Sequence, residues 1–425
     1  MRALLVTHGT RGDVQPFLAL AVALRGRGHE AVLAAPESFA GAAAEHGVEF
    51  APLDEGPNRL MDDPVVKEAI DGGYRGISGK ITAVRTARRI KPLMADVLRD
   101  VGAAARESRA DVVVHTPSLP AQHAAELLGV PAVLATFQPG WVPTNRFPCS
   151  MVPLPKLPRQ LNRATYLVVS ATLRSFRGVA ARWRIQDLEL PPRRGVHDLL
   201  REQLVLQAFS SLVTPVDPDW PNFVRTTGFW YLPATASWTP PGELVRFLDD
   251  GPEPVYVGFG SMAGRKAQHT AGVVAQAVRK AGVRAVVATG WGGITGIDSD
   301  DVLVIDQAPH DWLFPRVRAV VHHGGGGTTA AALAAGRPQV VCPFVADQPH
   351  WADRMHAVGV GAPPVRQPQL TADRLAEAIS RAIGDTAMCE RAEQLGADIR
   401  AENGVDQAVD ALEHAVDAGE EPRWV

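Results

Sequence analysis

Strand-like apolar runs alternate with helical patterns in two separate series along this chain. In the first series, residues 16–28 carry apolar side chains at helical spacing between two short apolar runs. The runs of the first series cover 3–7, 31–35, 111–116 and 131–137, and those of the second cover 255–259, 284–289, 302–305, 319–323 and 339–344. Such alternation is typical of parallel sheets covered by helices. The sequence therefore predicts an α/β fold with two doubly wound, Rossmann-like domains.

The segment between the two series has a different character. Residues 161–210 indicate helices with many arginines, and residues 215–241 are rich in proline and aromatic residues. A proline-rich stretch between periodic segments is typical of a domain linker. We therefore expect an N-terminal domain, a linker, a C-terminal domain, and a final helix that returns to the N-terminal domain, over residues 1–215, 216–241, 242–405 and 406–425.

Composition excludes several classes of protein. The net charge of −3 gives no reason to expect bulk attraction to nucleic acid. Cys149, Cys342 and Cys389 are far apart and match neither a metal site nor a disulfide framework. The N-terminal stretch indicates a strand and not a signal peptide, and no apolar run approaches the roughly 18 residues of a membrane span. We expect a cytoplasmic monomer or homodimer that holds no metal.

Four successive glycines, Gly324–Gly327, stand between a strand and a helix. His322 and His323 precede them, and Gly336 marks the end of the helix. A helix N-terminus directs free backbone N–H groups and its dipole toward an anion, and glycines let a phosphate approach closely. The loop therefore predicts phosphate binding, with a tight turn that binds no ligand as the alternative. The lack of a following lysine argues against a Walker-type site.

Polar residues also follow other predicted strands. In the loop THGTRGDVQP (7–16), Asp13 is either a helix cap or a catalytic base, and His8 is either a rival base or a buried histidine bonded to the backbone. In ADQPHW (346–351), Asp347 and Gln348 can hydrogen-bond hydroxyl groups. DSDD (298–301) matches the Asp-x-Asp pattern of metal sites, but its glycine-rich surroundings favour a solvated turn.

These loops carry a resemblance to a known family. Together with GFGSM (258–262) and the long segment APHDWLFPRVRAVVHHGGGGTTAAALAAGRPQVVCPFVADQPHWADR, they resemble the family 1 glycosyltransferases of the GT-B fold. Within that family, the chain looks most like bacterial enzymes that glycosylate antibiotics, and LNRATYLVVSATLRSFRG is similar to the sterol glucosyltransferase branch. The resemblance implies two Rossmann-like domains facing a central cleft, with the acceptor on the N-terminal domain and the nucleotide sugar on the C-terminal domain.

The resemblance also implies a role for individual residues. Asp13 would be the general base, and Asp347 and Gln348 would bind the donor sugar. The donor diphosphate would be bound by Thr10, Arg11, Ser261, His323, Gly325, Gly326, Gly327 and Thr328. The nucleotide base would lie near Gln307, Ala308 and His310. Trp141, Phe147 and Tyr166 would either line an apolar acceptor pocket or pack as ordinary core aromatics.

The implied reaction is an inverting, metal-independent transfer of a sugar from a dTDP- or UDP-sugar to a hydroxyl of a lipophilic acceptor such as a polyketide or macrolide. The nucleotide sugar is a co-substrate, and no cofactor is expected. A sterol or lipid glucosyltransferase using UDP-glucose is one alternative. A nucleotide-sugar 2-epimerase and a catalytically silent lipid-binding protein are alternatives of other classes.

Two further expectations concern specificity and surface. Plant members of the family place a ribose-binding glutamate where this chain has Ala331, so we expect dTDP to bind at least as well as UDP. The arginines of 85–92 and 177–184 indicate either solvated helix faces or a peripheral contact with an anionic or membrane-bound acceptor.

Overall fold

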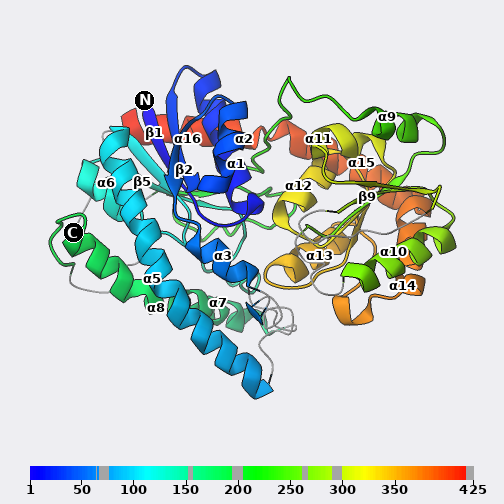
Figure 1. Cartoon of the computed structure of the whole chain (residues 1–425), viewed down its shortest axis with the longest axis horizontal. Coiled ribbons are helices and arrows are strands. Elements are labelled where there is room, and N and C mark those ends of the chain that lie inside the picture. The colour runs from blue at the N-terminus through cyan, green and yellow to red at the C-terminus, as the bar shows by residue number, and fades with distance from the viewer. Residues whose placement is uncertain are drawn as a thin grey trace. The chain divides into compact units, whose positions relative to one another are not determined.

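The computed structural model describes residues 1–63, 65–66, 76–151, 157–193, 204–260, 267–289 and 299–417. The chain divides into two compact units (Figure 1). The first comprises Met1–Ser211, Pro215–Leu232 and Asn403–Val425, and the second comprises Leu212–Thr214 and Pro233–Glu402. Each unit contains its own parallel sheet, which confirms the predicted fold class of two α/β domains.

The first unit is built on a seven-stranded sheet with the order β3-β2-β1-β4-β5-β6-β7. All neighbouring strands run parallel. The strands are β1 (Arg2–Val6), β2 (Glu30–Pro36), β3 (Glu49–Leu53), β4 (Val112–His115), β5 (Ala132–Thr136), β6 (Leu204–Gln207) and β7 (Val224–Thr226). The chain adds strands on one side of β1 and then continues from β4 on the other side. The strand order therefore reverses between β1 and β4, where ligands of doubly wound sheets bind.

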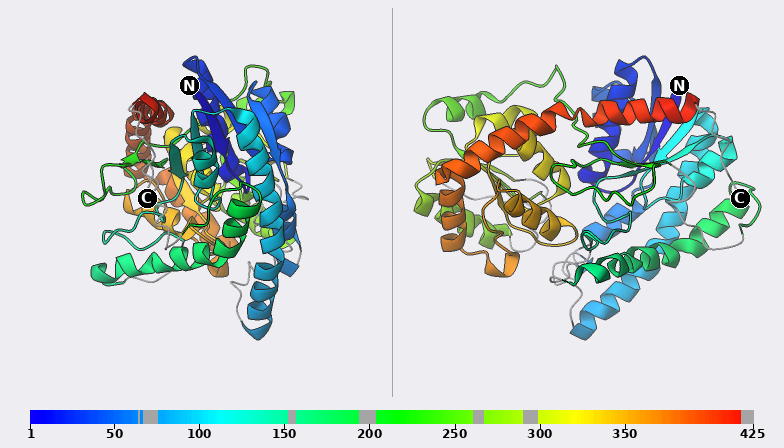
Figure 2. Two further views of the ribbon diagram at one scale, coloured as in Figure 1. Left: turned by 90° about the vertical axis from the view of Figure 1, so that its left-hand side faces the viewer. Right: turned by 180° about the vertical axis from the view of Figure 1, so that it is seen from behind.

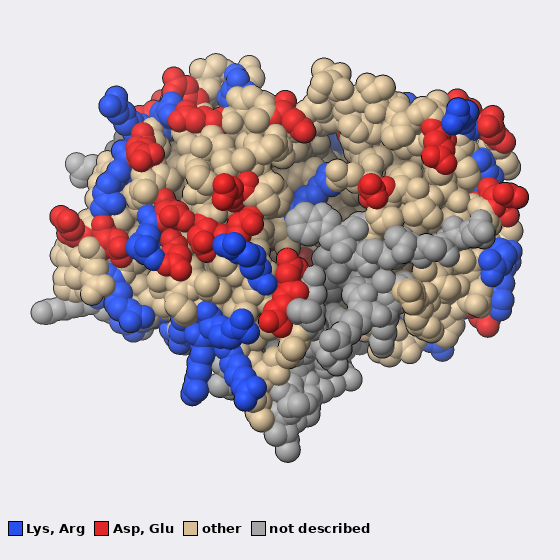
Figure 3. All heavy atoms as spheres, in the orientation of Figure 1, with Lys and Arg blue, Asp and Glu red and all other residues tan. Residues whose placement is uncertain are grey.

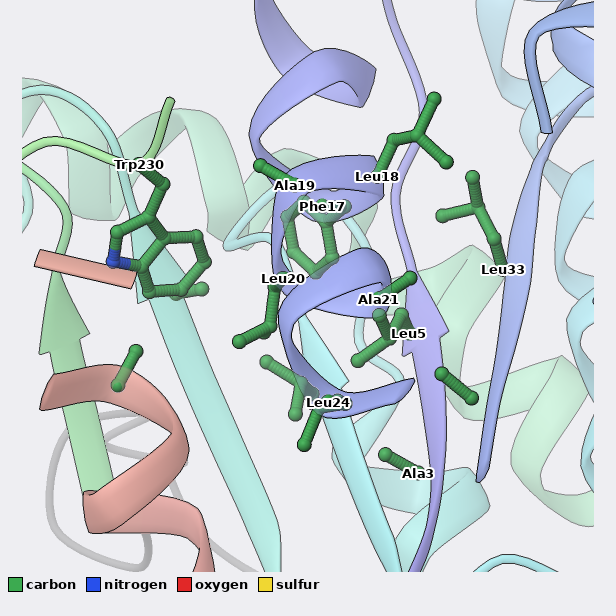
Figure 4. Packing of buried hydrophobic residues seen from close by; sticks show 14 of the residues in the cluster. Ala3, Leu5, Phe17, Leu18, Ala19, Leu20, Ala21, Leu24, Leu33 and Trp230 are labelled. Atoms are coloured by element: carbon green, nitrogen blue, oxygen red, sulfur yellow. The ribbon is translucent and has the colours of Figure 1, made fainter. Parts of the chain in front are cut away.

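Helices cover both faces of this sheet. They are α1 (Arg11–Gly26), α2 (Ala40–Glu45), α3 (Gly56–Asp62), α5 (Gly76–Ser108), α6 (Gln122–Leu128), α7 (Asn162–Thr165), α8 (Leu167–Gln186) and α16 (Gly404–Asp417). On one face, Phe17, Leu20 and Leu24 of α1 pack in a cluster that includes Trp230 and the buried side chains of α16 (Figure 4). Side chains from α5, α6 and α8 fill the other face.

The second unit repeats the design with five parallel strands in the order β10-β9-β8-β11-β12. The strands are β8 (Val255–Gly258), β9 (Ala285–Ala288), β10 (Val302–Ile305), β11 (Val320–His322) and β12 (Gln339–Val341). The helices are α9 (Gly242–Asp249), α10 (Ala267–Ala281), α11 (His310–Leu313), α12 (Gly326–Ala334), α13 (Gln348–Ala357), α14 (Ala372–Gly384) and α15 (Thr386–Ala401). The strand order of this sheet reverses between β8 and β11. Thr371 caps α14 by accepting a hydrogen bond from the N–H of Arg374.

The middle of the chain differs from the sequence prediction. Strand β6 lies within 161–210, where only helices were expected, and β7 lies within 216–241, which was expected to be a linker. Pro215–Leu232 belongs to the first unit, as does the final segment with α16. β7 lies in a proline-rich stretch and β6 in a segment dominated by helical patterns, so neither belongs to the regular alternation that marks the other strands. Strand pairing decides their conformation, because β6 adds to β5 and β7 adds to β6.

No helix in the described part of the chain combines the length and the apolar character needed to cross a membrane.

Candidate active site

The predicted site residues follow the strands that flank the two reversals of strand order. Thr10 and Asp13 come after β1, while His323 and the glycine run come after β11. Gly260 ends the described chain after β8, so Ser261 lies outside the described residues. Ligands of doubly wound sheets bind beyond the carboxyl ends of strands at such reversals. Each unit thus carries candidate residues at the position where its fold favours a ligand.

Asp13 lies on the first turn of α1 and not in a loop, because α1 begins at Arg11, five residues before the predicted start at Pro16. Its Oδ2 accepts hydrogen bonds from the backbone N–H of Thr10 (2.8 Å) and from the Thr10 hydroxyl (3.2 Å). Its Oδ1 accepts none within the described part of the chain. Burial raises the pKa of Asp13, and the Thr10 donors oppose that rise. The carboxylate is therefore held through one oxygen and can accept a proton on the other.

The loop before α1 is shaped to hold this carboxylate. Gly9 has φ +141°, and a Cβ at Gly9 would lie 2.3 Å from Oδ2 of Asp13. Asn58 of α3 donates a hydrogen bond to the Gly9 carbonyl at 2.8 Å. A side chain at position 9 would thus displace the capped carboxylate. Asn58 was missed by sequence reasoning, because it lies 49 residues away from the loop it fixes.

His8 and Arg11 lie close to Asp13 in the chain. His8 donates from Nε2 to the Asp54 carbonyl at 2.9 Å, and burial lowers its pKa. This is the backbone-bonded histidine that the sequence left open as an alternative to a rival base. Arg11 is exposed on α1, and its Nε donates to Gln15 one turn later at 3.2 Å.

In the second unit, His322 orders the glycine run. It is fully buried at the end of β11, donates from Nε2 to Oε1 of Gln339 at 2.8 Å, and accepts at Nδ1 the N–H of Gly324 (3.1 Å). Both contacts suit the neutral ring, and burial lowers the pKa of His322 to about 3. Sequence reasoning gave His322 no role, since Gln339 belongs to the next strand.

The four glycines serve different purposes. Gly324 has φ +91°, and a Cβ there would lie 2.9 Å from Cγ1 of Val341. A Cβ on Gly325 would lie 2.6 Å from Nε2 of His323. At Gly327 a Cβ would meet nothing within 4 Å. Packing therefore requires glycine at the first two positions, whereas Gly327 opens onto free space at the start of a helix.

That helix, α12, begins at Gly326 with Gly325 as N-cap, two residues before the predicted start. Thr329 donates to the Gly325 carbonyl at 3.0 Å, whereas the hydroxyl of Thr328 makes no hydrogen bond within the described chain. The first N–H groups of a helix have no partner inside it and favour an anion. The ring of His323 adjoins these groups. Its Nδ1 is buried without a well-formed hydrogen bond among the described residues, and burial lowers its pKa to about 4 against a weaker effect of the Gly258 backbone.

The loop before α13 is held by side chains of its own segment. Oε1 of Gln348 accepts the backbone N–H groups of Phe344 (2.8 Å) and Val345 (3.1 Å), so this oxygen fixes the loop, and sugar binding by Asp347 and Gln348 stays a prediction. Ala346 has φ +56°, a strained value for a residue with a side chain. Oδ2 of Asp347 accepts the Trp351 indole N–H at 2.8 Å. Trp351 is buried and lies against Gly326 of the glycine run, so it links the two loops.

Aromatic packing shapes the region predicted to hold the nucleotide base. His310 begins α11 and stacks on Phe314, with ring centroids 4.2 Å apart and planes 14° apart. Ala308 is buried in the same cluster as Phe314, and Ala331 of α12 packs against that cluster. Gln307 is exposed. His310 is thus a packed ring at the edge of this region.

The three aromatic residues considered for an acceptor pocket pack within the first unit. Tyr166 is buried, and its hydroxyl lies 3.4 Å from the Phe147 carbonyl oxygen. Phe147 is half-buried and meets Trp220 edge-on at 6.4 Å. Trp141 is half-buried and donates to Gln138 at 3.4 Å. Tyr166 therefore packs as a core aromatic, which was the alternative to a pocket-lining role, and an acceptor pocket at Trp141 and Phe147 stays a prediction.

The described part of the Asp-x-Asp match forms a turn. The N–H of Val302 donates to the Ser299 carbonyl at 3.0 Å, and the backbone N–H of Asp301 donates to the Ser299 hydroxyl oxygen at 3.4 Å. Asp298 lies outside the described residues. Over the ranges that the structure describes, no group of three His, Cys, Asp or Glu side chains is arranged to hold a metal ion.

Comparison with known proteins identifies the family. Residues 3–144 match the glycosyltransferase family 28 N-terminal domain, and residues 287–414 match the C-terminal domain of erythromycin biosynthesis protein CIII-like proteins. The chain belongs to the family 1 glycosyltransferases of the GT-B fold. The two matches fall on the first and second units respectively, apart from the end of the second match, which includes α16.

Individual relatives agree with this membership. A sterol 3-beta-glucosyltransferase from Emericella nidulans is 33% identical over 96% of this chain, which spans only 29% of that protein's length. The structure of a glycosyltransferase of kitacinnamycin has a TM-score of 0.68 at 23% identity and covers 98% of this chain and 99% of its own. Glycosyltransferase VinC in complex with dTDP has a TM-score of 0.66 at 20% identity, with 98% and 100% covered. These structures share the GT-B fold with the present glycosyltransferase.

Proposed function

We propose that this glycosyltransferase catalyses an inverting, metal-independent transfer of a sugar from a nucleotide diphosphate sugar to a hydroxyl of a lipophilic acceptor. The observation that carries the proposal is the pairing of chemistries at the two strand-order reversals. Among the described residues, Asp13 offers a carboxylate oxygen that accepts no hydrogen bond, and α12 offers N–H groups beside His323 that have no partner inside the helix. The Asp13 oxygen suits a general base, and the N–H groups of α12 suit the leaving diphosphate.

In this reaction the acceptor hydroxyl transfers its proton to Oδ1 of Asp13 as its oxygen bonds to the anomeric carbon. The bond from that carbon to the diphosphate breaks, and the leaving oxygen takes the electron pair. A single displacement of this kind inverts the anomeric centre. Burial supports Asp13 as the base, because it raises the carboxylate's proton affinity. The α12 N–H groups, Thr328 and the His323 ring stabilise the negative charge of the leaving group.

Two acceptor classes fit the proposal. The Emericella relative is named a sterol 3-beta-glucosyltransferase and aligns with nearly the whole of this chain, which favours a sterol or similar lipid with UDP-glucose as donor. The solved structure from the kitacinnamycin system favours a natural-product aglycone instead. Turnover of a sterol with UDP-glucose, compared with a macrolide aglycone and a dTDP-sugar, distinguishes the two classes.

The nucleotide preference depends on Ala331. An alanine side chain cannot accept a hydrogen bond from a ribose 2′-hydroxyl, so UDP gains nothing there over dTDP. A site without the polar partner discriminates little between the two. We expect dTDP to bind at least as tightly as UDP in calorimetric titration. A preference for UDP above about tenfold, or about 1.4 kcal/mol, would contradict this expectation.

The decisive experiment follows the fate of the donor. The enzyme is incubated with a nucleotide sugar alone, with the sugar and acceptor, and with both in EDTA. We expect release of the nucleotide diphosphate only with acceptor, a product of inverted configuration, and no effect of EDTA. An epimerised donor in the absence of acceptor would establish the 2-epimerase instead, and rescue of EDTA-treated enzyme by magnesium would refute the metal-free mechanism.

We also propose a cytoplasmic location. All three cysteines are free thiols, and two of them, Cys149 and Cys342, are buried. Unpaired buried thiols agree with a reducing compartment.

A further inference from the structure

The outer end of α8 carries apolar side chains that remain exposed. Nine large apolar residues in the described chain are exposed, and four of them fall within residues 151–168, namely Met151, Leu161, Leu167 and Val168. Leu167 is 62% exposed and Val168 is 52% exposed. No residue of α8 between Leu167 and Gly178 is buried. Clustered exposure of this kind marks a surface that meets another partner.

The same part of the chain is strongly basic. Residues 127–186 contain eight Lys or Arg and no Asp or Glu, although the chain as a whole has a net charge of −3. Arg163 of α7 and Arg174 and Arg182 of α8 are all exposed. Figure 3 shows Lys and Arg side chains gathered where the lower part of α5 lies in Figure 1, and α5 packs against α8. A basic surface with exposed apolar side chains is complementary to a partner that is both anionic and apolar.

The helix geometry brings the two features together. At 3.6 residues per turn, Leu167, Arg174 and Arg182 project to one side of α8. Trp183 projects to the opposite side and is buried in the first unit. Figure 2 shows α8 running along the outside of the first unit, beyond its sheet. The exposed side of α8 therefore combines apolar side chains at its start with arginines further along the helix.

We propose that this α8 surface, made of Met151, Leu161, Leu167, Val168, Arg174 and Arg182, docks on an anionic lipid bilayer. The arginines meet the phosphate headgroups, and the apolar side chains at the start of the helix enter the interface. Amphipathic helices rich in basic residues lie on membranes in this way. The proposal is independent of the catalytic proposal, because docking requires neither donor nor acceptor.

Cosedimentation of the full chain with lipid vesicles tests the proposal. We expect binding to phosphatidylcholine vesicles that contain phosphatidylglycerol, little binding to phosphatidylcholine alone, and release at high salt. Each arginine should contribute about fivefold in affinity near an anionic surface, so Arg174→Gln combined with Arg182→Gln should weaken binding about 25-fold. Leu167→Ser combined with Val168→Ser should weaken it at unchanged charge.

A matched control removes the same charge elsewhere. Arg374→Gln combined with Arg381→Gln changes two exposed arginines of α14 and should leave vesicle binding within about twofold. Circular dichroism of every variant checks that the fold is kept. Equal weakening by the control pair, or equal binding to neutral and anionic vesicles, would overturn the proposal. So would retention on heparin without vesicle binding, which would favour an acidic protein as the partner.

Discussion

At the scale of single residues, the proposed chemistry depends on the two oxygens of Asp13. Asp13→Asn keeps an oxygen for the Thr10 hydrogen bonds but removes the basic oxygen. We expect α1 and nucleotide affinity to be preserved, while turnover falls by roughly 10²–10⁴-fold. Because the pKa of Asp13 is raised, the wild-type rate should decline on the acid side at a higher pH than an ordinary carboxylate would give. Steady-state kinetics across pH measure both effects. His8→Gln is the control and should cost less than tenfold, or about 1.4 kcal/mol, since His8 contacts the Asp54 backbone. Asp13 is not the base if His8→Gln lowers turnover more than Asp13→Asn does.

At the scale of an element, the start of α12 separates packing from binding. A side chain at Gly324 must adopt φ +91° and meet Val341, so Gly324→Ala should lower the melting temperature. Gly327→Ala adds a methyl group to open space on a helix, where alanine is favoured over glycine by up to about 1 kcal/mol. We therefore expect Gly327→Ala to keep or raise stability and yet to weaken nucleotide diphosphate binding by at least about tenfold, because the methyl group occupies the proposed phosphate position. Calorimetry measures the unfolding and the nucleotide binding of the two variants, Gly324→Ala and Gly327→Ala. Full nucleotide affinity in Gly327→Ala would place the phosphates elsewhere.

At the scale of the whole molecule, two sheets with separate cores should give separate unfolding steps, and acid should weaken the second unit. His322 has a folded-state pKa of about 3, whereas an unfolded histidine titrates near 6.5. Below pH 6.5 the histidine is protonated in the unfolded chain but stays neutral in the folded chain. The free energy of unfolding therefore falls as pH decreases from about 6.5 toward 3, by up to about 1.4 kcal/mol per pH unit for this histidine. His322→Gln should flatten the slope of the affected transition, while His414→Gln, at an exposed position of α16, should not. Urea unfolding at several pH values tests this. A transition unaffected between pH 7 and 5 would contradict it.

The sequence by itself determined the two α/β units and the type of site. Repeated apolar runs and glycines at helix starts are local signals, because the backbone period and the need for positive φ act on neighbouring residues. The strands β1, β2, β4, β5 and β8 to β11 therefore lie within about one residue of their predicted bounds, and β12 begins at the predicted residue but ends earlier, at Val341. The glycine run was assigned to the start of a helix for the same reason.

Tertiary structure alone decided the contacts between distant segments. The short strands β6 and β7 exist because β5 and then β6 offer an open edge to pair with, which no local period records. Gln339 fixes the tautomer of His322 from the next strand, and Asn58 fixes Gly9 from another helix. Gln348 accepts backbone N–H groups of its own loop, a contact that the sequence did not indicate. A side chain's identity limits which bonds it can form, and only the folded chain determines which partner comes within reach.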